Sequence, residues 1–194
     1  MQAFFSMLAE SFDLPILDWI QSNLQCGFLD FIMPIITLFG DAGIFWIACS
    51  VILLLIPKYR KVGLSMGFAL LLGLLVCNVT LKPLCQRIRP YDYQLQYFQR
   101  EIVLLIEAQH DFSFPSGHTI ASFEACTVLL LGNKKFGIPA AILAILIAFS
   151  RMYLYVHYPT DVIASIILGT LFGVIGYLVS HKVTLSTKGK YLDK

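Results

Sequence analysis

Val162–Ser180 reads VIASIILGTLFGVIGYLVS and contains no charged side chain. Because an α-helix rises about 1.5 Å per residue, a stretch of this length and composition is typical of a helix that crosses a membrane. Four further runs have the same character, and Glu124 is the only charge within them. The chain as a whole is 58% hydrophobic and 13% charged, which excludes an ordinary soluble domain. The four runs are Ala42–Pro57, Val62–Leu81, Thr119–Asn133 and Phe136–Ser150.

These runs predict an all-α membrane protein with one domain, a bundle of five to six transmembrane helices over residues 42–180. Residues 1–40 differ, because four acidic side chains lie among aromatic and aliphatic ones. This pattern predicts an N-terminal amphipathic helix in the membrane interface, and whether the segment adds a sixth span is left open. Residues 181–194 contain four lysines and are expected to form a basic cytoplasmic tail.

Basic residues also predict the orientation. If five spans begin near residue 41, three basic segments fall on one side of the membrane. They are the Lys58–Lys61 connection, the Lys134–Lys135 connection and the C-terminal tail. The positive-inside rule makes that side cytoplasmic, so we expect a multi-pass protein of the plasma membrane with a cytoplasmic C-terminus. The remaining cations fall on the extracytoplasmic side, where this rule gives no reason for them. They are Lys82, Arg87, Arg89, Arg100 and Arg151.

Three polar clusters lie at the expected outer ends of three successive spans. Each by itself has an ordinary explanation, such as a snorkelling lysine, a serine N-cap or an interfacial histidine. Together they place cations, a helix N-terminus and two histidines at one membrane face, a combination suited to phosphoryl transfer. The clusters are Lys82 with Arg89-Pro90, then Pro115-Ser116-Gly117-His118, then Ser150-Arg151 with His157 and Asp161.

The spacing within the clusters leads to local predictions. Lys82 and Arg89 are seven residues apart, so on a continuing helix that ends at Pro90 they share one face. Asp161 follows His157 by four residues, so it can bind one imidazole nitrogen and leave the other as a nucleophile, or it can simply interact with a helix dipole. Arg151 lies six residues before His157, which predicts that its helix ends or bends near Val156, or that Arg151 reaches round with its long side chain.

The three clusters resemble the motifs of the type 2 phosphatidic acid phosphatase superfamily, whose pattern is Lys-x6-Arg-Pro, Pro-Ser-Gly-His and Ser-Arg-x5-His-x3-Asp. The resemblance extends over residues 81–161 at motif level, and the chain length and helix number match small bacterial members. It implies a metal-independent lipid phosphatase without a cofactor, in which His157 attacks phosphorus, Asp161 orients it, and His118 protonates the leaving oxygen and later activates water. It also implies a set of phosphate ligands. These are Lys82, Arg89, Ser116, Gly117 and Arg151.

Other polar residues remain open. Glu124 lies within a span on nearly the same face as Gly117, and Asn78 lies one turn before Lys82, so both are candidates for supporting the site. Arg87 and Arg100 are outside the motifs, and we favour solvated surface charges for both. The five cysteines show no metal-binding spacing, and a Cys26–Cys85 disulfide is only a conjecture.

The predicted function is removal of phosphate from a lipid phosphate or diphosphate at the outer face of the membrane, with undecaprenyl diphosphate as the favoured substrate. Phosphatidate and phosphatidylglycerophosphate are the other substrates that the resemblance implies. One alternative is a phosphotransferase of the same architecture, and a less favoured one is a small lipid transporter. Nothing in the sequence indicates a nucleic-acid partner, and it leaves the oligomeric state undetermined.

Overall fold

The computed structural model describes residues 1–189, with side chains for residues 1–180, so the predicted basic tail of residues 181–194 lies outside the described side chains. Within the described part the chain is helical and contains no strand. The α-helices are α1 (Gln2–Leu8), α2 (Leu14–Leu24), α3 (Gly27–Leu38), α4 (Ile44–Leu55), α5 (Arg60–Gly73), α6 (Lys82–Cys85), α7 (Pro90–Phe98), α8 (Gly117–Gly132), α9 (Lys134–Tyr153) and α10 (Pro159–Gly189). Between them lie two π-helical segments, η1 (Ala9–Asp13) and η3 (Leu74–Leu81), and a 3-10 turn, η2 (Asp41–Gly43).

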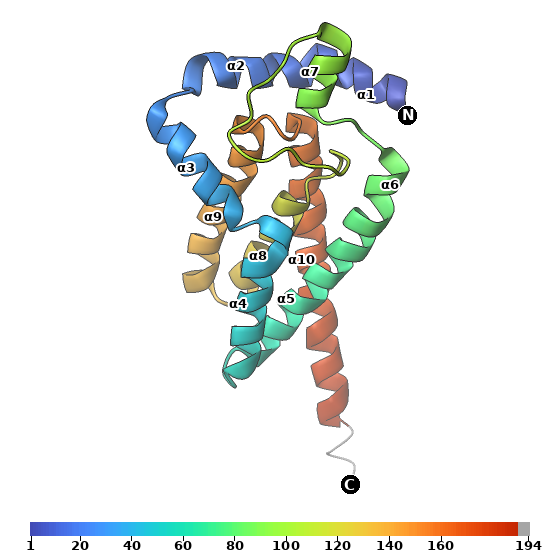
Figure 1. Ribbon diagram of the computed structural model, residues 1–194. Coiled ribbons are helices and arrows are strands. Elements are labelled where there is room, and N and C mark those ends of the chain that lie inside the picture. The colour runs from blue at the N-terminus through green and yellow to red at the C-terminus, as the bar shows by residue number, and fades with distance from the viewer. Residues whose placement is uncertain (190–194) are drawn as a thin grey trace.

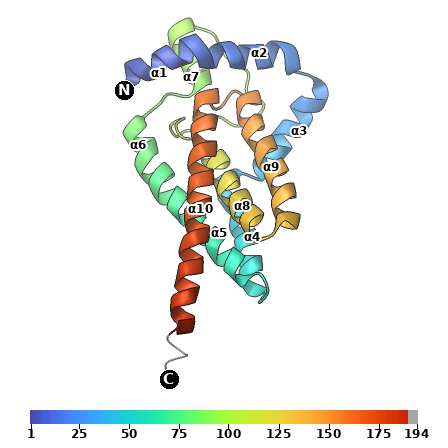
Figure 2. The same ribbon diagram turned by 180° about the vertical axis from the view of Figure 1, so that it is seen from behind.

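Helix α8 occupies the centre of the bundle, and α5, α9 and α10 pack around it (Figures 1 and 2). Its buried side chains include Ser122, Glu124 and Thr127, so the neighbouring helices shield the most polar of the predicted spans from lipid. Four segments are long and apolar enough to cross a membrane, whereas α8 is a shorter apolar helix. The predicted all-α membrane class is therefore confirmed. The four segments are Gly27–Leu55, Arg60–Phe98, Lys134–Tyr153 and Pro159–Ser180.

The first of these segments is broken in the middle. Helix α3 ends at Leu38, and left-handed backbone at Ala42 (φ 47°) and Gly43 (φ 66°) redirects the chain into α4. The break lies against the start of α8, because a Cβ added to Gly40 would lie 2.7 Å from Cδ2 of His118. Residues 27–38, which we expected in the interfacial segment, thus form a helix that packs against α9 and continues toward α4.

Helices α1 and α2 lie across one end of the bundle, the end that also carries the loop of residues 99–116 and the α9–α10 connection (Figure 1). Their acidic side chains accept hydrogen bonds from other parts of the protein, while Phe4, Met7 and Trp19 are exposed. Contact of this exposed face with the membrane interface stays a prediction. The donors are Tyr93 for Glu10, Arg87 and Thr160 for Asp13, Tyr155 and Arg100 for Asp18 and, at the start of α3, Tyr153 for Asp30.

The prediction that Lys82 and Arg89 share a continuous helix is wrong. Helix α6 ends at Cys85, Gln86 adopts left-handed backbone (φ 48°), and Arg89 is extended (ψ 153°). Pro90 begins α7 rather than ending a helix, since proline suits the first helical turn and forces the preceding residue out of the helical region. The two cations therefore reach the site from different directions.

The close contact of α4 with α5 depends on Gly63. A Cβ at this position would lie 2.6 Å from the backbone nitrogen of Leu54 and 2.7 Å from the carbonyl oxygen of Ser50. We expect Gly63→Ala to destabilise the protein by about 1–3 kcal/mol, because neither backbone can yield without separating the helices. In detergent, Tm should fall by roughly 2–10 °C for a chain of this size. Gly27→Ala is the control, because its Cβ would meet nothing within 4 Å, and an equal loss there would contradict the explanation.

Candidate active site

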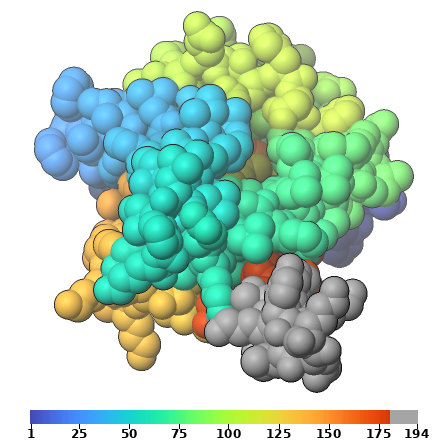
Figure 3. All heavy atoms as spheres, turned by 90° about the horizontal axis from the view of Figure 1, so that it is seen from below, coloured from blue at the N-terminus to red at the C-terminus, as the bar shows by residue number. Residues whose placement is uncertain are grey.

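A cavity of about 530 Å³ lies where α6, the start of α8 and the α9–α10 connection meet. Its polar end brings together residues from all three sequence clusters, and its other end runs between α4, α5 and α8 along apolar side chains. Seen from below, the surface is hollowed between the α3–α4 segment and the green η3–α6 segment (Figure 3). The candidate residues that line the cavity are Asn78, Lys82, Arg89, Gly117, His118, Glu124, Arg151 and His157.

His157 lies in the short connection between α9 and α10 and is buried. Helix α9 ends at Tyr153, as the spacing of Arg151 and His157 predicted, and the backbone N–H of His157 donates to the carbonyl of Arg151 (3.2 Å). The imidazole Nε2 lies 3.3 Å from Nη1 of Arg89. Burial, followed by the charges of Arg89 and Arg151, lowers the pKa of His157 well below its ordinary value. The imidazole is therefore neutral, with a lone pair available for attack.

Asp161 is fully buried behind His157, with Oδ2 3.6 Å from Nδ1. The same oxygen accepts hydrogen bonds from the Ser113 hydroxyl (2.5 Å) and from the backbone N–H of Tyr158 (3.1 Å). The Ser113 oxygen is also 3.5 Å from Nδ1 of His157, so Ser113 lies between the two catalytic candidates. No pattern in the sequence indicates Ser113, because it belongs to a loop that only the fold brings to this position.

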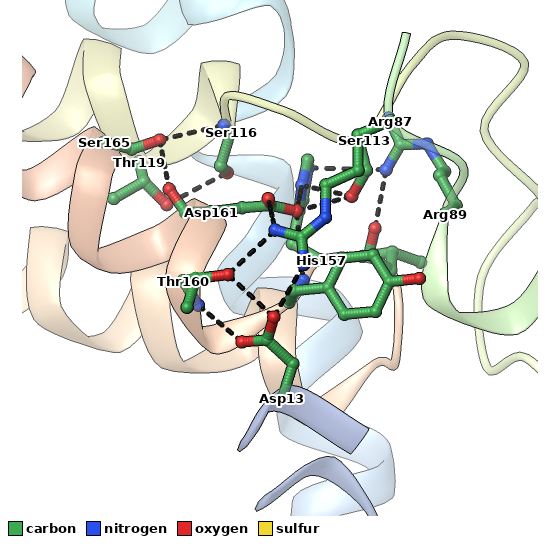
Figure 4. A network of polar contacts seen from close by, with 12 residues as sticks. Asp13, Arg87, Arg89, Ser113, Ser116, Thr119, His157, Thr160, Asp161 and Ser165 are labelled. Carbon is green, nitrogen blue, oxygen red and sulfur yellow. Dashed lines mark hydrogen bonds and ion pairs between the residues drawn. The ribbon is translucent and has the colours of Figure 1, made fainter. Parts of the chain in front are cut away.

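Arg87 is buried, and the expectation of a solvated surface charge is wrong. Its guanidinium donates to Asp161 (2.5 Å) and to Asp13 of the N-terminal segment (2.6 Å), as Figure 4 shows. It also stacks on the ring of Tyr158, 3.9 Å from the centroid. The contacts with two carboxylates and one aromatic ring offset the free-energy cost of removing Arg87 from water. No pattern in the sequence indicates these contacts. Arg100 is half exposed and pairs with Asp18 (3.0 Å), so the expectation of a surface charge holds for it.

Lys82 and Arg89 both bind one carboxylate, that of Asp111 in the loop of residues 99–116. Arg89 is held further by the carbonyls of Asp111 and Val156, each 2.8 Å from a guanidinium nitrogen. Burial raises the pKa of Asp111, but the contacts with Lys82 and Arg89 outweigh burial and leave it below the ordinary value. The loop thus places a charged carboxylate on two cations that the motif assigns to phosphate.

Arg151 projects from the last turn of α9 and is buried. One guanidinium nitrogen donates to the hydroxyl of Thr37 on α3 (2.5 Å). Nε and Nη2 have no hydrogen-bond partner among the residues that the structure describes. Buried donors of a charged group are costly to leave unpaired, so this side chain, which lines the cavity, is prepared for an anionic ligand.

His118, in the first turn of α8, is held by Asp41 at the break between α3 and α4. Its Nε2 lies 2.7 Å from Oδ1 of Asp41, and the backbone of Gly40 also packs closely against the His118 side chain. Asp41 carries no signal in the sequence, because this contact joins residues that are far apart in the chain.

The remaining candidates differ in their placement. The hydroxyl of Ser116 accepts from Thr119 (3.0 Å), its N–H donates to Ser165 (2.8 Å), and Ser116 does not line the cavity. Gly117 lines it beside Asn78, whose Oδ1 would lie 3.3 Å from an added Cβ. Glu124 is buried against Gly73, and its Oε1 has no hydrogen-bond partner among the described residues.

Two further expectations concern metals and disulfides. Within the described part of the chain, no group of three or more His, Cys, Asp or Glu side chains is arranged to hold a metal ion. Cys26 is exposed and Cys85 is buried, and both are free thiols rather than the conjectured disulfide.

Comparison with known proteins gives the family. Residues 62–185 match the PAP2 superfamily. The chain belongs to this family. This PAP2 protein is 32% identical over 147 residues to the undecaprenyl-diphosphatase of Sulfolobus acidocaldarius, an alignment that covers 75% of the chain and 68% of that protein. It is 28% identical over 174 residues to the lipid A 4'-phosphatase of Bacteroides thetaiotaomicron, with 84% and 75% covered.

A solved structure agrees with this assignment. The transmembrane PAP2-type phosphatidylglycerolphosphate phosphatase of Bacillus subtilis superimposes with a TM-score of 0.68 and 25% identity, over 93% of this chain and 94% of that one. The protein is thus a multi-pass membrane protein and a PAP2-type lipid phosphatase. The family match begins at residue 62, so Asp13 and Asp41 lie outside it.

The contact of Asp111 with Lys82 and Arg89 predicts competition with phosphate. We expect Asp111→Asn to lower the concentration of orthovanadate that half-inhibits phosphate release about two- to fivefold. This change corresponds to the free energy that a partly exposed ion pair typically contributes. Glu107→Gln removes an exposed carboxylate from the same loop and should leave inhibition unchanged. Weaker inhibition of Asp111→Asn would mean that Asp111 orders the two cations instead of competing for them.

Proposed function

We propose that this phosphatase works through a covalent phosphohistidine on His157. Nε2 of His157 attacks phosphorus, the bond to the leaving oxygen breaks with its electron pair going to that oxygen, and His118 gives the oxygen a proton. In the second step His118 takes a proton from water, the water oxygen attacks phosphorus, and the P–N bond electrons return to Nε2. The products are a dephosphorylated lipid and inorganic phosphate, and both histidines regain their starting protonation.

Each neighbour then has a role in these steps. Lys82, Arg89 and Arg151 neutralise the phosphoryl oxygens, and Gly117 lets the phosphate approach the first turn of α8. Asp161 and Ser113 face Nδ1 of His157, which directs Nε2 toward the cavity and stabilises the positive imidazole of the intermediate. The Asp41 carboxylate beside Nε2 of His118 favours the protonated imidazole, which is the form that gives its proton to the leaving oxygen. Ser116 acts by supporting the loop, because its hydroxyl is turned to Thr119.

The observation that carries this proposal is how few fixed partners the three cations have. Arg151 is buried with two unpartnered nitrogens, and Lys82 and Arg89 bind a carboxylate from a loop instead of one built into a helix. All three line one cavity with a neutral His157. A structural ion cluster would be closed by fixed acidic partners, whereas this one has room for the oxygens of a phosphate.

The cavity supports a lipid as the bearer of that phosphate. From the cations it continues along Ile47, Val51, Leu71 and Leu74, which line it although about half of each side chain is exposed. These residues lie on α4 and η3 and within α5, in segments apolar enough to span the membrane, so the cavity opens sideways toward the acyl region. An amphiphile can therefore place its headgroup among the cations while its chain remains in lipid.

We propose undecaprenyl diphosphate, or a closely related polyprenyl diphosphate, as the substrate. The relative with 32% identity is named an undecaprenyl-diphosphatase, and a diphosphate brings more negative charge to three cations than a monoester does. The distribution of lysine and arginine supports an active site on the extracytoplasmic side and a cytoplasmic C-terminus.

The mechanism predicts the behaviour of a nucleophile variant. His157→Ala should lower kcat for phosphate release at least about 10³-fold, because the variant lacks the imidazole that forms the covalent intermediate. His110→Ala removes an exposed histidine and should keep full activity. Wild-type turnover should persist in EDTA. Complete loss with the chelator, or an active His157→Ala protein, would contradict the proposal.

A substrate panel tests the choice of lipid. Purified protein in detergent should release phosphate from a polyprenyl diphosphate with a higher kcat/KM than from phosphatidate, phosphatidylglycerophosphate or lipid A. A soluble phosphate ester should be hydrolysed slowly, with a raised KM, because it does not use the apolar part of the cavity. Preference for phosphatidylglycerophosphate or lipid A would retain the mechanism and replace the substrate.

A further inference from the structure

Arg87 joins the N-terminal segment to the catalytic carboxylate. One of its terminal nitrogens donates to Oδ1 of Asp161 at 2.5 Å, and the other donates to Oδ2 of Asp13 at 2.6 Å. The exposed fractions of the three side chains are 0–2%, so solvent screens these contacts very little. Figure 4 shows the guanidinium between the two carboxylates.

Thr160 ties the same groups together. Its backbone N–H donates to Oδ1 of Asp13 (2.9 Å), and its hydroxyl donates to Oδ2 of Asp13 (2.7 Å) and accepts from Nη1 of Arg87 (2.8 Å). Thr160 immediately precedes Asp161 in the first turn of α10. Asp13 therefore holds the backbone next to Asp161 as well as the guanidinium that binds it.

The charges of this group bear on His157. Arg87 paired with Asp161 alone would cancel the negative charge that faces the imidazole. Because Asp13 supplies a second carboxylate, the three side chains together keep one net negative charge beside His157. Asp161 can then stabilise a positive imidazole while its position is fixed by Arg87.

We propose that Asp13 is a positioning residue for the phosphatase reaction, which acts through Arg87 and Thr160 on Asp161. The N-terminal segment, which lies outside the matched family region, is thereby part of the active site and not only a membrane contact. The inference rests on the proposed role of His157 as the nucleophile. The proposed role distinguishes Asp13 from Glu10 and Asp18, the other acidic residues near it in the segment. Glu10 binds the Tyr93 hydroxyl, and Asp18 binds the Tyr155 hydroxyl and Arg100, and neither touches Asp161 or its partners.

The test compares Asp13→Asn with Asp18→Asn in the full chain. Both variants remove a carboxylate that docks the same segment, but only Asp13→Asn changes the charge behind His157. We expect Asp13→Asn to lower kcat about 10–100-fold with KM changed less than about twofold, as for other outer partners of a catalytic group. Asp18→Asn should keep kcat within about twofold. Equal kcat values for the two variants would overturn the proposal.

A double-mutant comparison distinguishes positioning from general support. If Asp13 acts through Arg87, then Asp13→Asn should lower kcat much less in an Arg87→Gln background than in the wild type. A full additional loss in that background would show that Asp13 acts independently, and it would overturn the proposed route.

A milder variant covers the case in which Asp13→Asn does not fold. Thr160→Val keeps the shape of the side chain and removes only the hydroxyl shared by Asp13 and Arg87. It should lower kcat several-fold at unchanged KM and nearly unchanged Tm, and wild-type kcat in a folded Thr160→Val protein would count against the proposal. His157→Ala is measured in parallel. An active His157→Ala protein would refute the phosphohistidine mechanism itself, whereas an inactive one with a fully active Asp13→Asn would refute only the role of Asp13.

Discussion

Three cations share one cavity with a neutral histidine, and the rest of the site is arranged around this concentration of like charge. Withdrawing Lys82, Arg89 and Arg151 from water is unfavourable, and each also repels the others. The loop carboxylate of Asp111 offsets two of them, and Thr37 binds the third. Burial, together with the same charges, lowers the pKa of His157 and leaves its imidazole unprotonated. Thus the cations that would attract a phosphate also favour the neutral form of the proposed nucleophile.

The packing of the helices positions these charged side chains. The most polar span, α8, is surrounded by α5, α9 and α10, so its first turn presents Gly117 and His118 to the cavity from a fixed position. The break in the first span carries Asp41 to His118, and the end of α9 turns the chain so that Arg151 and His157 face the same space. The cavity then continues between α4 and α5 along apolar side chains.

Much of this architecture followed from the sequence. Uncharged runs predicted the bundle because a membrane leaves few other ways to satisfy the backbone. The family resemblance of the motifs named His118, His157 and the three cations as candidates, and all five line one cavity. The prediction of one helix from Lys82 to Arg89 was wrong, because α6 ends at Cys85 and Pro90 starts a new helix instead of ending the old one. Arg87 was misjudged as a surface charge, since nothing in its neighbours along the chain indicates the carboxylates that bury it.

The sequence by itself determined the class of protein, the approximate spans and the residue types available for phosphoryl transfer, because hydrophobicity and motif spacing are local properties of the chain. Only the tertiary structure decided which groups support those residues. Asp13, Asp41, Asp111 and Ser113 reach the site from separate segments, and each contact depends on how helices pack and loops return. Charge pairing over such separations leaves no periodic signal in a single sequence, so it becomes visible only when the chain is folded.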